Sequence, residues 1–128
     1  MQLKNISEET ILSNLKIKAF NAMQLESVEA NHAHNNVVLI SATGSGKTLA
    51  FLLPLLHTLE ENPTKTTALI IVPSRELAQQ IEQVFKQIGT GLKITCCYGG
   101  HKREIEENNL AQAPALIVGT PGRLADHI

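Results

Sequence analysis

Aromatic residues are scarce in this sequence of 128 residues, which has no tryptophan, one tyrosine and three phenylalanines. A folded core must therefore be built mainly from aliphatic side chains. Hydrophobic residues make up 43% of the chain, which excludes an intrinsically disordered or collagen-like protein. The length matches one ordinary domain, so we expect a single core.

Positive charge is also in short supply. Eleven Lys and Arg residues against twelve Asp and Glu residues give a net charge of -1, so no bulk positive field is available to attract nucleic acid or an anionic membrane. Any contact with nucleic acid must then be local. Aspartate is nearly absent, since Asp126 is the only one.

Two further absences concern the cellular compartment. Cys96 and Cys97 are adjacent, which makes a disulfide between them geometrically poor and favours a reducing intracellular environment. The N-terminus has no apolar run typical of a signal peptide, and no stretch approaches the ~18 apolar residues of a membrane span. We therefore expect a cytoplasmic protein without a membrane partner.

Strand and helix patterns alternate along the chain. Ser7 precedes a helical pattern that ends near Lys18, and Asn21 with Gln24 predicts a capping box at the start of a second helix. Continuous apolar runs, typical of strands buried in a parallel sheet, occupy residues 37–40, 68–72, 94–98 and 115–118. Helical patterns stand between them at residues 47–60, 75–88 and 102–110, with a surface loop at 60–67. This order predicts an α/β fold, an open parallel sheet with helices on both faces, whose ligands bind at the carboxyl ends of the strands.

A phosphate-binding motif follows the first apolar run. It is SATGSGKT, made of Ser41, Ala42, Thr43, Gly44, Ser45, Gly46, Lys47 and Thr48. Its glycines let backbone amides turn inward as an anion nest, the lysine can reach the β and γ phosphates, and Thr48 can ligate Mg²⁺. The pattern predicts a P-loop for a nucleotide phosphate; the alternative is a glycine-rich turn that opens a helix without a ligand.

A P-loop enzyme also needs a carboxylate, usually at the end of another strand, to hold Mg²⁺ and orient the attacking water. The predicted strand ends read Val72-Pro73, Tyr98-Gly99 and Val118-Gly119, none of them acidic, and Asp126 lies in a predicted helix. Either the magnesium site is unusual or the sequence stops before reaching the carboxylate.

Several segments together resemble the DEAD-box family of ATP-dependent RNA helicases, within helicase superfamily 2. The first RecA-like domain of that family carries, in order, a glutamine motif, the P-loop, PTRELA, a GG pair and TPGR. This chain has Gln24, SATGSGKT, PSRELA at residues 73–78, Gly99-Gly100, and TPGR at residues 120–123. The resemblance covers the chain from about Ile11 onward.

The resemblance implies a truncated RecA-like P-loop domain. Residues 1–128 would be the N-terminal portion of domain 1, with a short helical region at about 7–36 and a P-loop core at about 37–128. The acidic D-E-A-D motif, the rest of domain 1 and the second RecA-like domain, a partner within the same chain, would follow. We expect the full-length protein to couple ATP hydrolysis to RNA unwinding, and residues 1–128 alone to be inactive.

The resemblance also assigns roles to residues. Lys47 and Thr48 would be catalytic, and Gln24 would recognise adenine or, alternatively, only close its capping box. Sugar-phosphate contacts to single-stranded RNA would come from Pro73, Ser74, Arg75, Gly99, Gly100, Thr120, Pro121, Gly122 and Arg123. Arg75 could instead pair with Glu76 or Glu82, Arg123 could bind an internal carboxylate, and the glycines could be plain turns. Competing functions are an RNA clamp that responds to nucleotide without unwinding, and a superfamily 2 DNA helicase.

Overall fold

The computed structural model describes residues 6–59 and 65–128. The elements in chain order are α1 (Glu8–Leu15), α2 (Ala22–Ala33), α3 (Lys47–Thr58), β1 (Ala68–Ile71), α4 (Arg75–Ile88), β2 (Ile94–Cys97), α5 (Arg103–Leu110), β3 (Leu116–Gly119) and α6 (Pro121–Asp126). The last residue of the helix predicted at 47–60, and residues 60–64 of the loop predicted at 60–67, lie outside the described residues.

The strands form one parallel sheet in the order β1-β3-β2. In the register of this sheet, Gly119 of β3 stands opposite both Ile71 of β1 and Cys97 of β2, so the three strands end together. Helix α4 packs against β2 and β3, and α5 packs against β2. The predicted α/β fold with a parallel sheet is confirmed, and residues that follow the strands meet at one edge.

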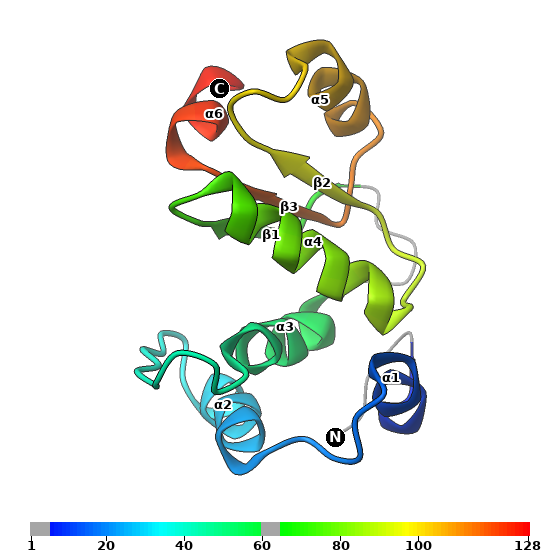
Figure 1. The fold of residues 1–128 in the computed structure, drawn as a ribbon, viewed down its shortest axis with the longest axis vertical. Helices are drawn as coiled ribbons and strands as arrows, with labels where there is room; N and C mark the ends of the chain where they lie inside the picture. Colours follow the sequence, from blue (N-terminus) through cyan, green and yellow to red (C-terminus); the bar gives the residue numbers. More distant parts are fainter. Residues whose placement is uncertain (1–5, 60–64) are drawn as a thin grey trace.

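The prediction of a strand at residues 37–40 is wrong for this structure. These residues form an extended loop between α2 and α3 (Figure 1), and Val38 and Ile40 are 87% and 91% exposed. A strand needs a neighbour to take up its backbone N–H and C=O groups. Within the described part of the chain no strand lies beside this segment, and the side chains of Val38 and Ile40 face solvent.

Strand β1 is open in a similar way. Within residues 6–59 and 65–128 it pairs only with β3, and its side chains Leu69 and Ile71 are 55% and 60% exposed. Strands of parallel sheets are normally covered on both faces, and an apolar edge left open is a site where further chain can pair. The exposed apolar residues of β1 and of residues 37–40 are therefore surfaces that suit additional structure.

The N-terminal helices begin and end where local chemistry directs. The Oγ atom of Ser7 caps α1 by accepting the Thr10 amide at 3.2 Å, and Lys16, in a left-handed conformation with φ of 58°, ends that helix. At α2 the predicted capping box between Asn21 and Gln24 is confirmed.

Helix α4 joins the two halves of the molecule, because it contacts the sheet on one side and helices α1 and α3 on the other (Figure 1). Its buried residues Ala78, Ile81, Phe85 and Ile88 repeat at helical spacing and belong to one hydrophobic core. None of the helices in the described ranges is both long and apolar enough to cross a lipid bilayer.

Candidate functional site

The SATGSGKT segment forms a turn that opens directly into α3. Gly44 and Gly46 have φ angles of 80° and 91°, a region that side chains rarely adopt, and Gly46 is the N-cap of α3. No side chain caps this helix start, so the first amides of α3 remain available to an anion. Lys47 is exposed, and no carboxylate of the described residues pairs with its ammonium group.

Two serines close the turn. The Ser45 hydroxyl donates to the Ala42 carbonyl oxygen at 2.6 Å, and the Ser41 and Ser45 hydroxyl oxygens are 2.5 Å apart. Because the Ser45 proton is already donated to Ala42, Ser41 is the donor in the second bond. Ser41 thus contributes a hydrogen bond that stabilises the turn.

Gln24 of α2 braces the same turn from outside. Its Oε1 accepts the Asn21 amide at 2.9 Å, and its Nε2 donates to the Gly46 carbonyl at 3.2 Å. Asn21 adds a bond from its Nδ2 to the Ser45 carbonyl at 3.0 Å. A Cβ on Gly46 would lie 2.6 Å from Gln24 Nε2, so glycine is required for this close approach. Gln24 is 5% exposed, and one N–H and one lone pair of its carboxamide remain for a ligand.

Sequence reasoning missed a third link between α2 and α3. The Ser27 hydroxyl donates to the Ala50 carbonyl at 2.5 Å, and both residues are buried. Ser27 lies three residues after Gln24, on the same helix face, and this spacing was the available signal.

The turn fits a nucleotide phosphate group by its donors: amides at a helix start, the Lys47 ammonium group and the Thr48 hydroxyl. A carboxylate at a strand end is lacking among the described residues, because β1, β2 and β3 are followed by Val72, Tyr98 and Thr120. Asp126 is exposed and lies in α6, as the sequence predicted.

The PSRELA and GG segments meet at the carboxyl ends of β1 and β2. Ser74 caps α4 by accepting the Leu77 amide at 3.3 Å, and Arg75 follows it with 58% of its side chain exposed. Arg75 Nε pairs with Glu76 Oε1 at 3.3 Å, one of the two partners considered from the sequence. The Arg75 guanidinium also lies over Gly100, where a Cβ would meet Arg75 Nη1 at 3.1 Å. Arg75 and Gly100 thus form one surface.

Tyr98 also belongs to this region, although its place at a strand end was the only signal for it in the sequence. Gln79 Nε2 of α4 donates to the Tyr98 hydroxyl at 2.9 Å, and the Tyr98 ring stacks on His101 with centroids 4.8 Å apart. These contacts fix the residues on both sides of Gly99 and Gly100.

The TPGR segment begins α6 beside the same loop. The Thr120 amide donates to the Cys97 carbonyl at 3.0 Å, while Pro121 and Gly122 are exposed. Arg123 turns inward: its Nε donates to Glu106 Oε1 at 2.8 Å, its Nη2 donates to the His101 carbonyl, and 15% of its side chain is exposed. Of the two roles considered from the sequence, the structure shows Arg123 bound to an internal carboxylate.

Glu106 of α5 is fully buried and accepts four hydrogen bonds. Besides the bond from Arg123, Oε1 accepts from His127 Nε2 at 2.7 Å, and Oε2 accepts from the Tyr98 amide at 3.1 Å and from His101 Nδ1 at 2.9 Å. Burial raises the pKa of Glu106, but the hydrogen bonds from His127, His101, Tyr98 and Arg123 outweigh it and hold the pKa below its ordinary value. The carboxylate therefore stays ionised inside the protein.

The sequence did not single out Glu106, because its partners come from distant segments. The one available signal was its position four residues before Leu110, on the inner side of a short helix.

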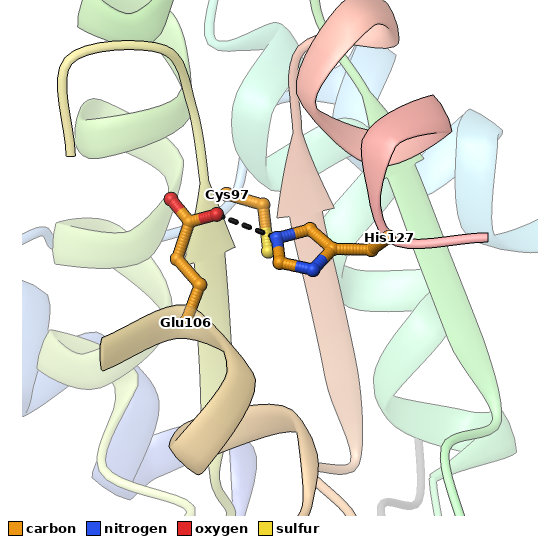
Figure 2. A group of neighbouring side chains, drawn as sticks. All are labelled: Cys97, Glu106 and His127. Atoms are coloured by element: carbon orange, nitrogen blue, oxygen red, sulfur yellow. Dashed lines mark hydrogen bonds and ion pairs between the residues drawn. The ribbon is translucent and has the colours of Figure 1, made fainter. Parts of the chain in front are cut away.

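Cys97, Glu106 and His127 bring their ligand atoms within 4.8 Å of one another (Figure 2). A cation placed there would meet the Arg123 guanidinium, which already binds the same carboxylate oxygen as His127. Burial, with a smaller effect of Glu106, raises the pKa of the Cys97 thiol to about 11, which disfavours the thiolate that a metal requires. The donor set suits an internal ion-pair cluster better than a metal centre.

A family model described as DEAD/DEAH box helicase matches residues 21–128. The ATP-dependent RNA helicase DDX47 of Drosophila melanogaster is 44% identical over 116 residues, which are 89% of this chain and 23% of that protein. The ATP-dependent RNA helicase DeaD of Buchnera aphidicola is 43% identical over 96 residues, 73% of this chain and 16% of that protein. The chain thus spans less than a quarter of the length of these two relatives.

Two solved structures share the fold. The DEAD-box helicase Mss116 bound to ssRNA and UDP-BeF gives a TM-score of 0.81 at 25% identity, covering 95% of this chain and 27% of that one. A hypothetical ATP-dependent RNA helicase from Sulfolobus tokodaii gives a TM-score of 0.77 at 30% identity, covering 94% and 36%.

Proposed function

This chain belongs to the DEAD/DEAH box helicase family, and we propose that it is part of an ATP-dependent RNA helicase whose P-loop binds the phosphates of ATP. The observation that carries the proposal is the uncapped start of α3, where the turn at Gly44 and Gly46 stands next to the exposed Lys47. A backbone nest and a lysine at a helix start are the groups that recognise β and γ phosphates.

Within this proposal, residues 1–128 are the N-terminal portion of the first RecA-like domain, a helical region at about 7–36 followed by a P-loop core at about 37–128. The open edge of β1 and the exposed residues 37–40 support it, because both are surfaces on which further strands of the same domain can pair. The share of each relative that this chain covers supports it as well.

In the complete protein, a bound Mg²⁺ would neutralise charge on the ATP phosphates. Thr48 would offer its hydroxyl to the ion, and an acidic residue outside this chain would complete the site. Lys47 would hold the β and γ phosphates, and Gln24 would keep the turn in place while its remaining N–H and lone pair face adenine. This chain alone would bind nucleotide without hydrolysing it.

RNA is the second ligand in the proposal. Mss116 was solved with ssRNA, and this chain shares its fold. The contacts to RNA would come from the edge where the strands end, from Pro73, Ser74, Arg75, Gly99, Gly100, Thr120, Pro121 and Gly122. Arg123 would support this surface through its bonds to Glu106 and to the His101 carbonyl. Backbone amides and one exposed arginine recognise phosphates without reading bases, so binding would be independent of sequence. A chain with a net charge of -1 can bind RNA in this way.

ATP would close the second RecA-like domain onto this one over the RNA strand, which couples hydrolysis to local unwinding.

The buried, unpaired Cys96 and Cys97 support a cytoplasmic location.

The test uses the full-length protein encoded by the reading frame. RNA-stimulated phosphate release should be lost in Lys47→Ala and retained in the matched control Lys65→Ala, which removes an exposed lysine far along the sequence from the turn. An unchanged rate in Lys47→Ala would refute the P-loop assignment. Stimulation by DNA but not RNA would favour a DNA helicase, and RNA-stimulated hydrolysis without strand separation of a short duplex would favour an RNA clamp.

A further inference from the structure

The GG loop and the TPGR turn lie on different elements, yet one buried carboxylate holds both. We propose that Glu106 is a positioning residue that joins these two segments into one rigid unit. In this proposal Arg123 is a second positioning residue, which binds inside the unit and does not contact RNA phosphate. The proposal rests on the proposed RNA-binding function and identifies the buried groups that support the RNA-binding surface.

The contacts of Glu106 divide between the two segments. Its Oε2 binds the Tyr98 amide and the His101 ring, which flank Gly99 and Gly100, at 3.1 and 2.9 Å. Its Oε1 binds Arg123 of α6 at 2.8 Å and His127, just beyond α6, at 2.7 Å. Each of the two carboxylate oxygens thus binds a different segment.

Arg123 of α6 also links the two segments. Its Nε binds Glu106, and its Nη2 binds the His101 carbonyl, so the guanidinium of a residue in α6 holds the backbone of the GG loop. Planar guanidinium groups suit two acceptors held in a fixed fork. With 15% of its side chain exposed, Arg123 would have to give up these bonds to reach a phosphate in solvent.

Arg75 provides the contrast. Its side chain is 58% exposed, its partner Glu76 is 70% exposed, and such surface pairs hold a guanidinium only weakly. The charge that meets RNA at this edge should therefore come from Arg75, while Arg123 acts through the shape of the loop and turn.

The first test is backbone hydrogen exchange in the 128-residue chain, read at the amides of His101, Thr120 and Leu124, each of which is hydrogen bonded. These amides do not bind Glu106 themselves, so they report on the coupling of the segments. Glu106→Gln should speed exchange at least tenfold in both the loop and the turn. A glutamine side chain has one acceptor oxygen, and its NH₂ group only donates, so it cannot accept hydrogen bonds from all four donors. The control Glu104→Gln, an exposed residue of the same helix, should change neither.

Arg123→Lys provides a second variant if Glu106→Gln does not fold. A lysine keeps the charge but cannot hold two acceptors in the fork, so the same three amides should exchange faster by a smaller factor. Faster exchange confined to the Tyr98 amide, or to one segment only, would overturn the proposal, since Glu106 would then support a single element.

The second test is the salt dependence of oligouridylate binding by the full-length protein, measured by fluorescence anisotropy. Removing a phosphate contact lowers the slope of log affinity against log salt by about 0.7 for a single strand. Arg75→Gln should lose this amount, whereas Arg123→Gln should lower affinity with the wild-type slope. If Arg123→Gln lowers the slope as much as Arg75→Gln does, Arg123 contacts RNA phosphate and its proposed internal role is wrong. If the full-length wild-type protein does not bind RNA at all, the proposed RNA function fails, and the exchange experiment still decides the role of Glu106.

Discussion

Replacing Gln24 with alanine tests how the nucleotide site is held in shape. The carboxamide makes two hydrogen bonds, one to the Asn21 amide and one to the Gly46 carbonyl, and it is 5% exposed. At about 1 kcal/mol for each bond, Gln24→Ala should lower the free energy of unfolding by about 2 kcal/mol.

The same substitution should weaken phosphate binding through the shape of the turn. Losing the bond to Gly46 removes about 1 kcal/mol that favours the binding-competent turn, which corresponds to a roughly fivefold weaker affinity. The loss should be seen with inorganic tripolyphosphate, which has no base. Any additional loss seen with ATP measures contact between Gln24 and adenine.

Both quantities can be measured on the 128-residue chain, by urea denaturation and by calorimetric titration with tripolyphosphate and with ATP. The control is Gln83→Ala, an exposed glutamine of α4 whose loss should change stability by no more than about 0.5 kcal/mol. If Gln24→Ala matches this control in stability and binds tripolyphosphate as tightly as the wild type, the bracing role of Gln24 is refuted.

Three further predictions concern packing, pH and catalysis. Gly119→Ala should destabilise the fold by about 1–3 kcal/mol in urea, since its Cβ would lie 2.6 Å from the Cys97 carbonyl oxygen, while Gly99→Ala, with open space around it, should not. The stability advantage of the wild type over Glu106→Gln should be complete above the ordinary glutamate pKa of 4.5 and shrink as pH falls, because the pKa of Glu106 is lowered by folding and protonation removes the charge that its partners stabilise. An advantage that grows in acid would contradict that sign. Residues 1–128 alone should release no phosphate from ATP, with or without RNA, and a measurable RNA-stimulated rate would contradict the need for an additional carboxylate.

Local chemistry accounts for what the sequence predicted well. The capping box at Asn21, the left-handed glycines of the turn at residues 41–48 and the bounds of α4 at Arg75 and Ile88 all reflect the chemistry of residues within a few positions. The apolar runs of β1, β2 and β3 were correctly predicted as strands because each finds a neighbour in the sheet. Residues 37–40 have an equally apolar pattern but no neighbour among the described strands, so periodicity alone could not predict their conformation.

Contacts between distant segments account for what the sequence could not predict. Glu106 is one of several glutamates in a charged stretch, and only the fold brings His101, Arg123 and His127 to it. The inward direction of Arg123 follows from that burial and not from the TPGR pattern. Gln24 illustrates both cases: its capping box was predictable, whereas its bond to Gly46, 22 residues away, was not.

The account depends most on the P-loop, and one titration tests it directly. Mg²⁺-ATP added to the 128-residue chain in a calorimeter should give saturable binding at one site. That binding should be lost in Lys47→Ala, whose circular dichroism spectrum should match the wild type because Lys47 is exposed. Failure of the folded wild-type chain to bind, or equal affinity in Lys47→Ala, would contradict the proposed function.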